Sequence, residues 1–535
     1  MPFAIRATLI AMSAVAVGAA LGSCSSGSSQ PAPDPGSAAV LPRSEPALAD
    51  APTAEPIPPE ITPMPVPLAR YGETGQLRIT ASVEVGAPVD GSAVLIVIDA
   101  FNAGHMSSYG YERRTTPRID SLAGEGIRFT NWVSNSSWTR PSFTTMITGW
   151  PKRLHGVELG GARIGRSHTT IAQIYRKAGF RTAAFMGNPL LKGSFGFEQG
   201  FEVYEDTADH GAFPRARVLV DKALQWLKRV GDRPFFLLVF FTDPHTPYRP
   251  PEDFRGFLAE AGATSNIEYP LREYEAPPPE AERRAIVAAY DGEVAYADSQ
   301  VGRLLDGLEA LGLRGRTTIA VTADHGEIFG EHDCYLHSYH MCEPVLRVPF
   351  VLASPSIPVR GAVEDRPYTH LDLLPTLTGL SGIEPPAGLV GRSYARDLRD
   401  PGSNRGRWIF SQYNAHGVRR QAIRLGRWKL IHHNAVDPGR FRRSMMRQKE
   451  ITDVPRADPL KLPSVAFDAE RFELFDLVDD IGELKNLYPA KQGEPFVADM
   501  KEQILKRCSN PPKNQPAPEL SPETLEALRA AGYIR

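Results

Sequence analysis

The sequence has almost no net charge. Its 60 lysines and arginines are balanced by 62 aspartates and glutamates, which gives a formal charge of −2 at pH 7. It also has no basic run and no basic stripe interleaved with aromatic residues. A nucleic-acid-binding surface normally needs such a concentration of positive charge. We therefore expect no nucleic-acid partner, and the sequence does not indicate an oligomeric state.

Long apolar stretches are scarce as well. Only residues 7–21, preceded by Arg6, form a long apolar stretch, and this stretch is shorter than the roughly 20 residues that span a bilayer. It leads into Leu21-Gly22-Ser23-Cys24, which resembles a bacterial lipoprotein box, where the cysteine is lipidated. We expect residues 1–23 to be a lipoprotein signal peptide and Cys24 to carry a lipid anchor to a membrane. A secretory signal with a chance cysteine is the alternative.

The localisation that follows is that of an exported bacterial lipoprotein, periplasmic or extracellular. Ser25, directly after the cysteine, favours sorting to an outer membrane or to the cell surface. Residues 24–90 are rich in Pro, Ala, Ser and Gly. Such a composition cannot bury a core and favours extended conformations, so we interpret this segment as a tether.

Cysteine is scarce. The chain has four, and after Cys24 only Cys334, Cys342 and Cys508 remain. Disulfides persist in exported proteins, and Cys334 lies close enough to Cys342 in sequence to bridge it. Spacing does not establish geometry, so a disulfide and a pair of buried free thiols remain equally open.

Short buried strands alternate with helical patterns, which predicts an α/β fold with a mainly parallel central sheet sandwiched by helices. At 535 residues the chain exceeds what one core usually fills. We expect a large domain over residues 91–390 and a smaller α+β subdomain over 391–535. The strands are predicted at 92–99, 181–186, 235–241, 317–323 and 349–353, and the helices at 169–177, 215–229 and 285–311. In the subdomain, short strands are predicted at 407–412, 421–424 and 428–431, and helices at 497–507 and 522–531.

Polar side chains stand where two of these strands end. Asp99 ends the first strand, and Asp324-His325 ends a later one. Ligands of such folds gather at the carboxyl ends of the strands. Between the two lies Thr139-Arg140-Pro141-Ser142, a loop-to-helix candidate with proline in the first turn. Two carboxylates, an imidazole and a hydroxyl are what a divalent cation needs to activate an oxygen nucleophile.

The motifs around these residues resemble the sulfatase family of the alkaline-phosphatase superfamily. The resemblance rests on the following segments: Thr139-Arg140-Pro141-Ser142 with Thr148-Gly149, Asp324-His325-Gly326-Glu327 with Arg347-Val348-Pro349, Asp243-Pro244-His245, Gly426-Arg427-Trp428-Lys429 and Glu473-Leu474-Phe475-Asp476. The resemblance runs from about Val94 to the terminus. It implies an alkaline-phosphatase-like catalytic domain that hydrolyses an anionic ester, sulfuric or phosphoric.

The same resemblance implies the roles of individual residues. Asp99, Thr139, Asp324 and His325 would hold one divalent metal, Ca²⁺ by family, with Mg²⁺, Mn²⁺ or Zn²⁺ as alternatives. Thr139 would be the nucleophile. His245 and His337 would bind the substrate oxygens and protonate the leaving group. Arg140 and Asn188 would contact the substrate anion.

The departures from the family pattern bear on the reaction. Sulfatases oxidise Cys or Ser to formylglycine, and Thr139 cannot undergo that maturation. Phe143 replaces the family's Arg, Ala100 replaces a second metal carboxylate, and the basic residues of the sulfate clamp are missing near Asn188. A threonine nucleophile resembles the nucleotide pyrophosphatases and the phosphoglycerol or phosphoethanolamine transferases of the same superfamily, and we favour a phosphodiester or phosphonate substrate. A phosphoglycerol- or phosphoethanolamine-type transferase and a non-catalytic surface protein with a degraded site are the alternatives.

Overall fold

The computed structural model describes residues 91–507, apart from 159–161, 207–213, 264–277, 338, 358, 400–406, 416, 439–440 and 442–468. The predicted signal peptide, Cys24 with its predicted lipid, the predicted tether, Cys508 and the predicted helix at 522–531 lie outside the described residues. Within the described part, no helix is both long and apolar enough to span a membrane.

A nine-stranded sheet forms the larger part of the structure, in the order β10-β2-β9-β6-β1-β5-β3-β4, with β11 beside β2. Every strand runs in one direction except β9, which is antiparallel to both β2 and β6. The mainly parallel sheet is therefore confirmed. The strands are β1 (Ser92–Ile98), β2 (Ile127–Val133), β3 (Arg181–Met186), β4 (Val203–Glu205), β5 (Phe235–Phe241), β6 (Thr317–Ala323), β9 (Arg347–Ala353), β10 (Ala362–Glu364) and β11 (Tyr368–Thr369).

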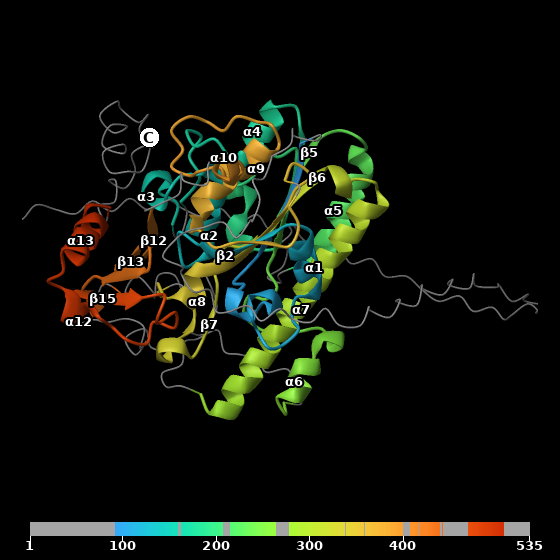
Figure 1. Cartoon of the computed structure of the whole chain (residues 1–535). Helices are drawn as coiled ribbons and strands as arrows, with labels where there is room; N and C mark the ends of the chain where they lie inside the picture. The colour runs from blue at the N-terminus through green and yellow to red at the C-terminus, as the bar shows by residue number, and fades with distance from the viewer. Residues whose placement is uncertain are drawn as a thin grey trace, which may run out of the picture. The chain divides into compact units, whose positions relative to one another are not determined.

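Helices cover both faces of this sheet (Figure 1). One layer contains α1 (Pro117–Glu125), α5 (Ala216–Val230) and α7 (Glu280–Ala310), and the other contains α2 (Thr139–Thr148), α4 (Ile171–Lys177) and α9 (Leu373–Leu380). Shorter elements are α3 (Lys152–His155), α6 (Gly256–Glu260), α8 (Glu343–Leu346), α10 (Tyr394–Arg399) and the hairpin of β7 (Ile328–Phe329) and β8 (Tyr335–Leu336). Strands β1, β5 and β6 are buried along their whole length. Such strands form near-continuous apolar runs, and for that reason they were predictable.

The smaller subdomain is a four-stranded antiparallel sheet in the order β12-β13-β14-β15. Its strands are β12 (Trp408–Ala415), β13 (Val418–Leu425), β14 (Trp428–His433) and β15 (Arg471–Asp476), followed by α12 (Tyr488–Lys491) and α13 (Pro495–Arg507). Apolar side chains of β13, β14 and β15 pack against α13 on one face. The opposite face packs against residues of the large domain, among them Trp138 and Leu346.

Candidate metal and nucleophile site

Asp99 follows the central strand β1 and is completely buried. Its Oδ2 accepts a hydrogen bond from the side-chain amide of Asn188 at 2.6 Å, whereas Oδ1 has no hydrogen-bond partner among the described residues. Burial, reinforced by the nearby Asp324 carboxylate, raises the pKa of Asp99 well above its usual value. One carboxylate oxygen is therefore anchored and the other is left available for a ligand.

Asp324 follows β6, the strand beside β1, and is held by its backbone as well as its side chain. Oδ1 accepts from the backbone amides of Ala100 at 3.2 Å and His325 at 2.9 Å, while Oδ2 has no partner within the described part of the chain. Burial raises the pKa of this carboxyl too. The carbonyl oxygen of Asp324 accepts from three side chains, those of Ser134, Ser142 and His370.

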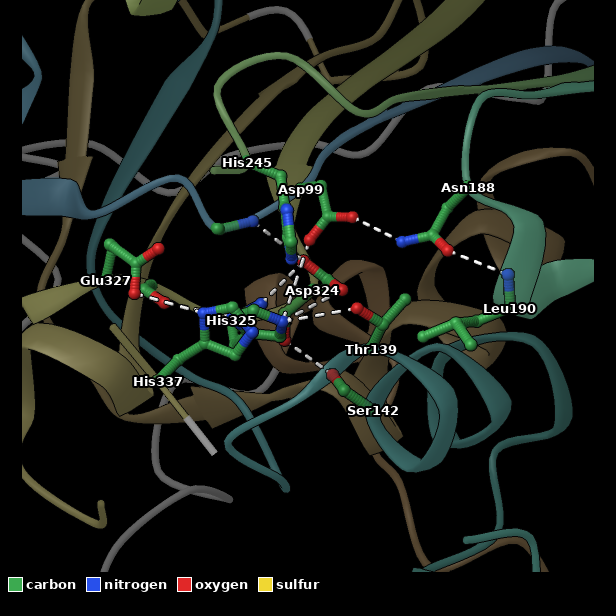
Figure 2. A network of polar contacts seen from close by, with 12 residues as sticks. Asp99, Thr139, Ser142, Asn188, Leu190, His245, Asp324, His325, Glu327 and His337 are labelled. Carbon is green, nitrogen blue, oxygen red and sulfur yellow. Dashed lines mark hydrogen bonds and ion pairs between the residues drawn. The ribbon is translucent and has the colours of Figure 1, made fainter. Parts of the chain in front are cut away.

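His325 turns one ring nitrogen toward both carboxylates (Figure 2). Its Nε2 lies 3.4 Å from Asp324 Oδ2, 3.6 Å from Asp99 Oδ1 and 3.3 Å from the hydroxyl oxygen of Thr139. Nδ1 lies 2.9 Å from the carbonyl oxygen of Gly326, which can only accept, so Nδ1 carries the proton and Nε2 presents a lone pair. Burial lowers the pKa of His325 to about 3. A neutral imidazole with a free lone pair is the form that binds metals.

Thr139 is the first residue of helix α2, directly after the extended Trp138. Pro141 occupies the first turn of that helix, where its missing amide hydrogen is not needed. The side chain of Thr139 is 2% exposed, and its hydroxyl oxygen lies within hydrogen-bonding distance of His325 Nε2. The start of the helix thus places a hydroxyl among the carboxylates and the imidazole, close to the partial positive charge of a helix N-terminus.

Two further histidines, both partly exposed, lie beside the cluster. The rings of His325 and His337 are 4.3 Å apart between centroids, and those of His245 and His337 are 5.2 Å apart. Glu327 Oε1 lies 3.0 Å from His337 Nδ1, and the Thr246 carbonyl accepts from His245 Nδ1 at 2.7 Å. The Thr246 contact fixes the tautomer of His245, with the proton on Nδ1. Burial lowers the pKa of His245 to about 4 and that of His337 to about 3, and it raises the pKa of Glu327 to about 8.

The donor set fits a divalent cation. Asp99, Asp324 and His325 each offer one ligand atom, these atoms lie within 4.8 Å of one another, and no other such group of three occurs among the described residues. Two buried carboxylate oxygens without partners are expensive to leave uncompensated. A cation between them and His325 Nε2 would satisfy both oxygens.

The other residues singled out in the sequence make contacts of their own. Arg140 stacks its guanidinium on Phe195, 4.4 Å from the ring centroid, and donates to the Ala162 carbonyl. Its substrate contact remains a prediction. Asn188 hydrogen-bonds to Asp99 and, through Oδ1, caps residues 189–191 by accepting from Leu190 N. Cys334 and Cys342 are free, buried thiols, so the disulfide alternative was wrong.

Several supporting residues were not found from the sequence. His370 donates from Nε2 to the Asp324 carbonyl and accepts from the Trp132 indole at Nδ1, 3.0 Å away. Ser134 and Glu327 also support the cluster, as described above. His370 lies 46 residues from Asp324 and has no motif around it, so only the folded chain reveals its role. Glu327 belongs to the motif Asp324-His325-Gly326-Glu327, so its position beside the site could have been predicted from the sequence.

The chain was compared with known proteins. Residues 92–383 match the family model described as Sulfatase. The ulvan-active sulfatase of Formosa agariphila is 25% identical over 344 residues, covering 59% of this chain and 66% of that protein, a little under two thirds of its length.

Two solved structures show the same fold. A phosphonate monoester hydrolase of Agrobacterium radiobacter aligns with a TM-score of 0.60 at 19% identity, covering 81% of this chain and 98% of that one. A protein solved with its substrate D-glucosamine-2-N,6-O-disulfate aligns with a TM-score of 0.61 at 18% identity, covering 80% and 99%.

Proposed function

The chain belongs to the sulfatase family of ester hydrolases, and from that premise we propose that it cleaves phosphodiesters or phosphonate esters with Thr139 as nucleophile. The observation that carries the proposal is the position of the Thr139 hydroxyl. It lies 3.3 Å from His325 Nε2 and beside two carboxylate oxygens that have no partner among the described residues. Asp99, Asp324 and His325 would hold one divalent cation.

The roles of the residues follow from their positions. A divalent cation, when bound, lowers the pKa of a coordinated hydroxyl and neutralises developing negative charge. Thr139 Oγ, after losing its hydroxyl proton to solvent, attacks phosphorus, the Oγ–P bond forms, and the bond to the leaving oxygen breaks. The partly exposed His245 and His337 lie beside the cluster, and one of them, protonated once the anionic substrate is bound beside it, gives its proton to the leaving oxygen. Water then displaces the phosphoryl group from Thr139 in a second in-line step.

The nucleophile favours phosphorus over sulfur. A phosphorylated or phosphonylated threonine can be released by attack of water on phosphorus. A sulfated threonine lacks the geminal hydroxyl with which a formylglycine hydrate expels sulfate, so turnover of sulfate esters is harder. The phosphonate monoester hydrolase with the same fold does not decide this question, because a likeness at that identity extends to the fold alone.

The donor set also bears on the choice of metal. Ca²⁺, which the family resemblance favours, prefers six to eight oxygen ligands. Here the described donors are two carboxylates, one imidazole and one hydroxyl, and Ala100 stands where a further carboxylate is expected. An imidazole with few carboxylates suits Mn²⁺ or Zn²⁺ better. We therefore propose one of these two ions as the metal.

The location of the protein is a separate proposal. Cys24, after the apolar residues 7–21, carries a lipid that holds the catalytic domain at a bacterial outer membrane or cell surface. Labelling cells with a radioactive fatty acid tests this. We expect label on the wild type and none on Cys24→Ser, and equal labelling of both would contradict the anchor.

The test of the proposed function is a substrate panel with the metal-loaded protein. The substrates are p-nitrophenyl sulfate, p-nitrophenyl phosphate, bis-p-nitrophenyl phosphate and p-nitrophenyl phenylphosphonate. We expect the diester or the phosphonate to be cleaved fastest, Thr139→Ala to be silent, and Thr139→Ser to retain measurable turnover because it keeps the hydroxyl. Preferential cleavage of the sulfate, or equal activity in Thr139→Ala, would contradict the proposal.

A further inference from the structure

Strand β13 carries a buried arginine, Arg420, that has no carboxylate partner among the described residues. Val418 and Ala422 of this strand lie in the apolar cluster that also contains Trp138, and Arg424 donates to Asn131 of β2 at 3.0 Å. Alternate residues of a strand share a face. Arg420 is two residues from both Val418 and Ala422, so its side chain lies on the same face of the strand and points toward the large domain. Its side chain is fully buried, with 0% exposure.

The other buried cations on this face have carboxylate partners. Arg424 Nη1 lies 3.3 Å from Glu343 Oε2, and Lys429 Nζ lies 2.9 Å from Glu343 and 2.7 Å from Glu483. No carboxylate from the described residues pairs with Arg420. Among the described residues, its Nη1 reaches only the Arg419 carbonyl at 3.3 Å and Asn434 Oδ1 at 3.5 Å, and Nε and Nη2 have no partner.

A second unpartnered nitrogen lies on the neighbouring strand. Arg420 pairs in register with His433 of β14 on one side and with Tyr413 of β12 on the other. His433 Nε2 contacts Glu473 at 2.9 Å, but Nδ1 has no partner within the described residues. Buried polar nitrogens without partners are rare in folded proteins and call for an explanation. Here they occur side by side.

Strand β12, which pairs with the strand of Arg420, is hydrogen-bonded to the loop that leads to Thr139. The hydrogen bonds run from Gln412 N to the Asn135 carbonyl at 3.0 Å and from Ser136 Oγ to the Gln412 carbonyl at 2.9 Å. Gln412 precedes Tyr413, the partner of Arg420. Ser136 precedes Thr139 by three residues, which span at most about 11 Å.

We propose that Arg420 anchors a second oxyanion group of the substrate, a carboxylate, sulfate or phosphate separate from the ester that Thr139 attacks. This inference rests on the proposed function and adds a substrate class, esters that carry an additional negative charge. The chemistry is specific, because Nε–H and Nη2–H form the parallel pair of donors that binds two oxygens of one oxyanion at once. Because the guanidinium is closed off from solvent, binding needs a local opening and is slow.

Thermal unfolding of the purified metal-loaded protein tests the site. The probes are sodium acetate, methyl sulfate and methyl phosphate, each after long incubation, with sodium chloride at equal ionic strength as reference. The variants are Arg420→Met, Arg420→Lys and, as a matched control, Arg419→Gln, which alters the exposed neighbour on the same strand. A probe that binds at the metal centre shifts the Tm of all these proteins alike, so only the differences between variants are informative.

We expect at least one oxyanion to raise the Tm of the wild type and of Arg419→Gln, and the probe that does so identifies the group. Arg420→Met loses this shift, and Arg420→Lys needs at least about tenfold more probe because it keeps the charge but not the paired donors. Without a probe, Arg420→Met melts about 1–2 °C higher than the wild type, because an unmatched buried charge has been removed. A shift that survives in Arg420→Met, or a lower Tm of that variant, would overturn the proposal.

Failure here is distinguishable from failure of the proposed function. Thr139→Ala keeps the Arg420-dependent shift, because its hydroxyl takes no part in holding the second oxyanion. If Thr139→Ala still turned over substrate, the nucleophile would be wrong and the anion site would be untouched. If Arg420→Met kept the shift, the anion site would be wrong and the nucleophile would be untouched.

Discussion

Asn188 donates a hydrogen bond of 2.6 Å to Asp99 Oδ2, and this leaves Asp99 Oδ1 turned toward His325 Nε2. The amide therefore determines which carboxylate oxygen is available to a metal. Hydrogen bonds that orient a metal ligand typically change metal affinity by about 10–100-fold when they are removed. The family resemblance gave Asn188 a direct contact with the substrate, and the two roles make different predictions.

For Asn188→Ala we expect apparent metal affinity to fall by about 10–100-fold, with most of the turnover recovered at saturating metal. Titration of activity with Mn²⁺ at fixed substrate measures this. The control is Asp253→Asn, which alters an exposed residue. Asn102→Ala is not used as the control because it would alter the loop after Asp99. Unchanged metal affinity together with a raised KM would indicate the substrate contact.

Metal removal provides a second test. Treatment with EDTA is expected to abolish turnover and to lower the Tm, because the two buried carboxylates of Asp99 and Asp324 are then left facing each other without a cation. We expect Mn²⁺ or Zn²⁺ to restore activity at lower concentration than Ca²⁺. Asp324→Ala should show no metal-dependent rise in Tm. Full recovery with Ca²⁺ alone would mean that further oxygen ligands complete the site.

His370 connects the site to the core. It bridges the indole of Trp132 and the carbonyl of Asp324, and it is completely buried. His370→Phe would leave the buried indole N–H of Trp132 without its acceptor, whereas Ser134 and Ser142 would still donate to the Asp324 carbonyl, and one buried unsatisfied group costs about 1–3 kcal/mol. Chemical denaturation should show a loss of this order or larger. In Ser142→Ala we expect a smaller loss, because Ser134 and His370 still donate to the same carbonyl.

How much could be predicted from the sequence depended on burial and on distance along the chain. Strands β3, β5 and β6 were predicted at their observed bounds because they are short apolar runs buried on both faces. Strand β2 was missed because Arg128, Thr130 and Asn131 interrupt its apolar pattern. The antiparallel direction of β9 was not predictable, since no local pattern distinguishes it.

The site was predictable where its residues stand in motifs at strand ends, as Asp99 and Asp324 do. Partners supplied by distant segments were not predictable. His370 and Asn188 act through single hydrogen bonds to other residues, and one isolated histidine or asparagine in a sequence has many possible roles. The missing partner of Arg420 could be recognised only after the carboxylates beside Arg424 and Lys429 had been located.

Asp298 gives a prediction of pH dependence away from the metal site. It accepts hydrogen bonds from the backbone amides of Arg118 and Ile119 at the start of α1, and burial raises its pKa to about 7. Between about pH 4 and 7 the folded state therefore holds a proton that the unfolded chain has lost. The contribution of this group to stability is present at low pH and declines as the pH rises through that window.

In Asp298→Asn this decline should be absent. We expect the stability of the wild type, relative to that of the variant, to be greater at pH 5 than at pH 8. Urea denaturation midpoints at both pH values measure this difference. Asp253→Asn, which changes an exposed carboxylate, should show the same difference from the wild type at both pH values. A constant difference between Asp298→Asn and the wild type would show that Asp298 does not titrate in this window.

The most direct measurement is mass spectrometry of the peptide that contains Thr139, after rapid acid quench of a reaction with p-nitrophenyl phenylphosphonate. The account predicts a phenylphosphonyl group on Thr139 that forms with the release of p-nitrophenol, decays as the second product appears, and is absent from Thr139→Ala. Rapid turnover by the wild type without any adduct on Thr139, together with a Thr139→Ala variant as active as the wild type, would contradict the role of Thr139 as nucleophile.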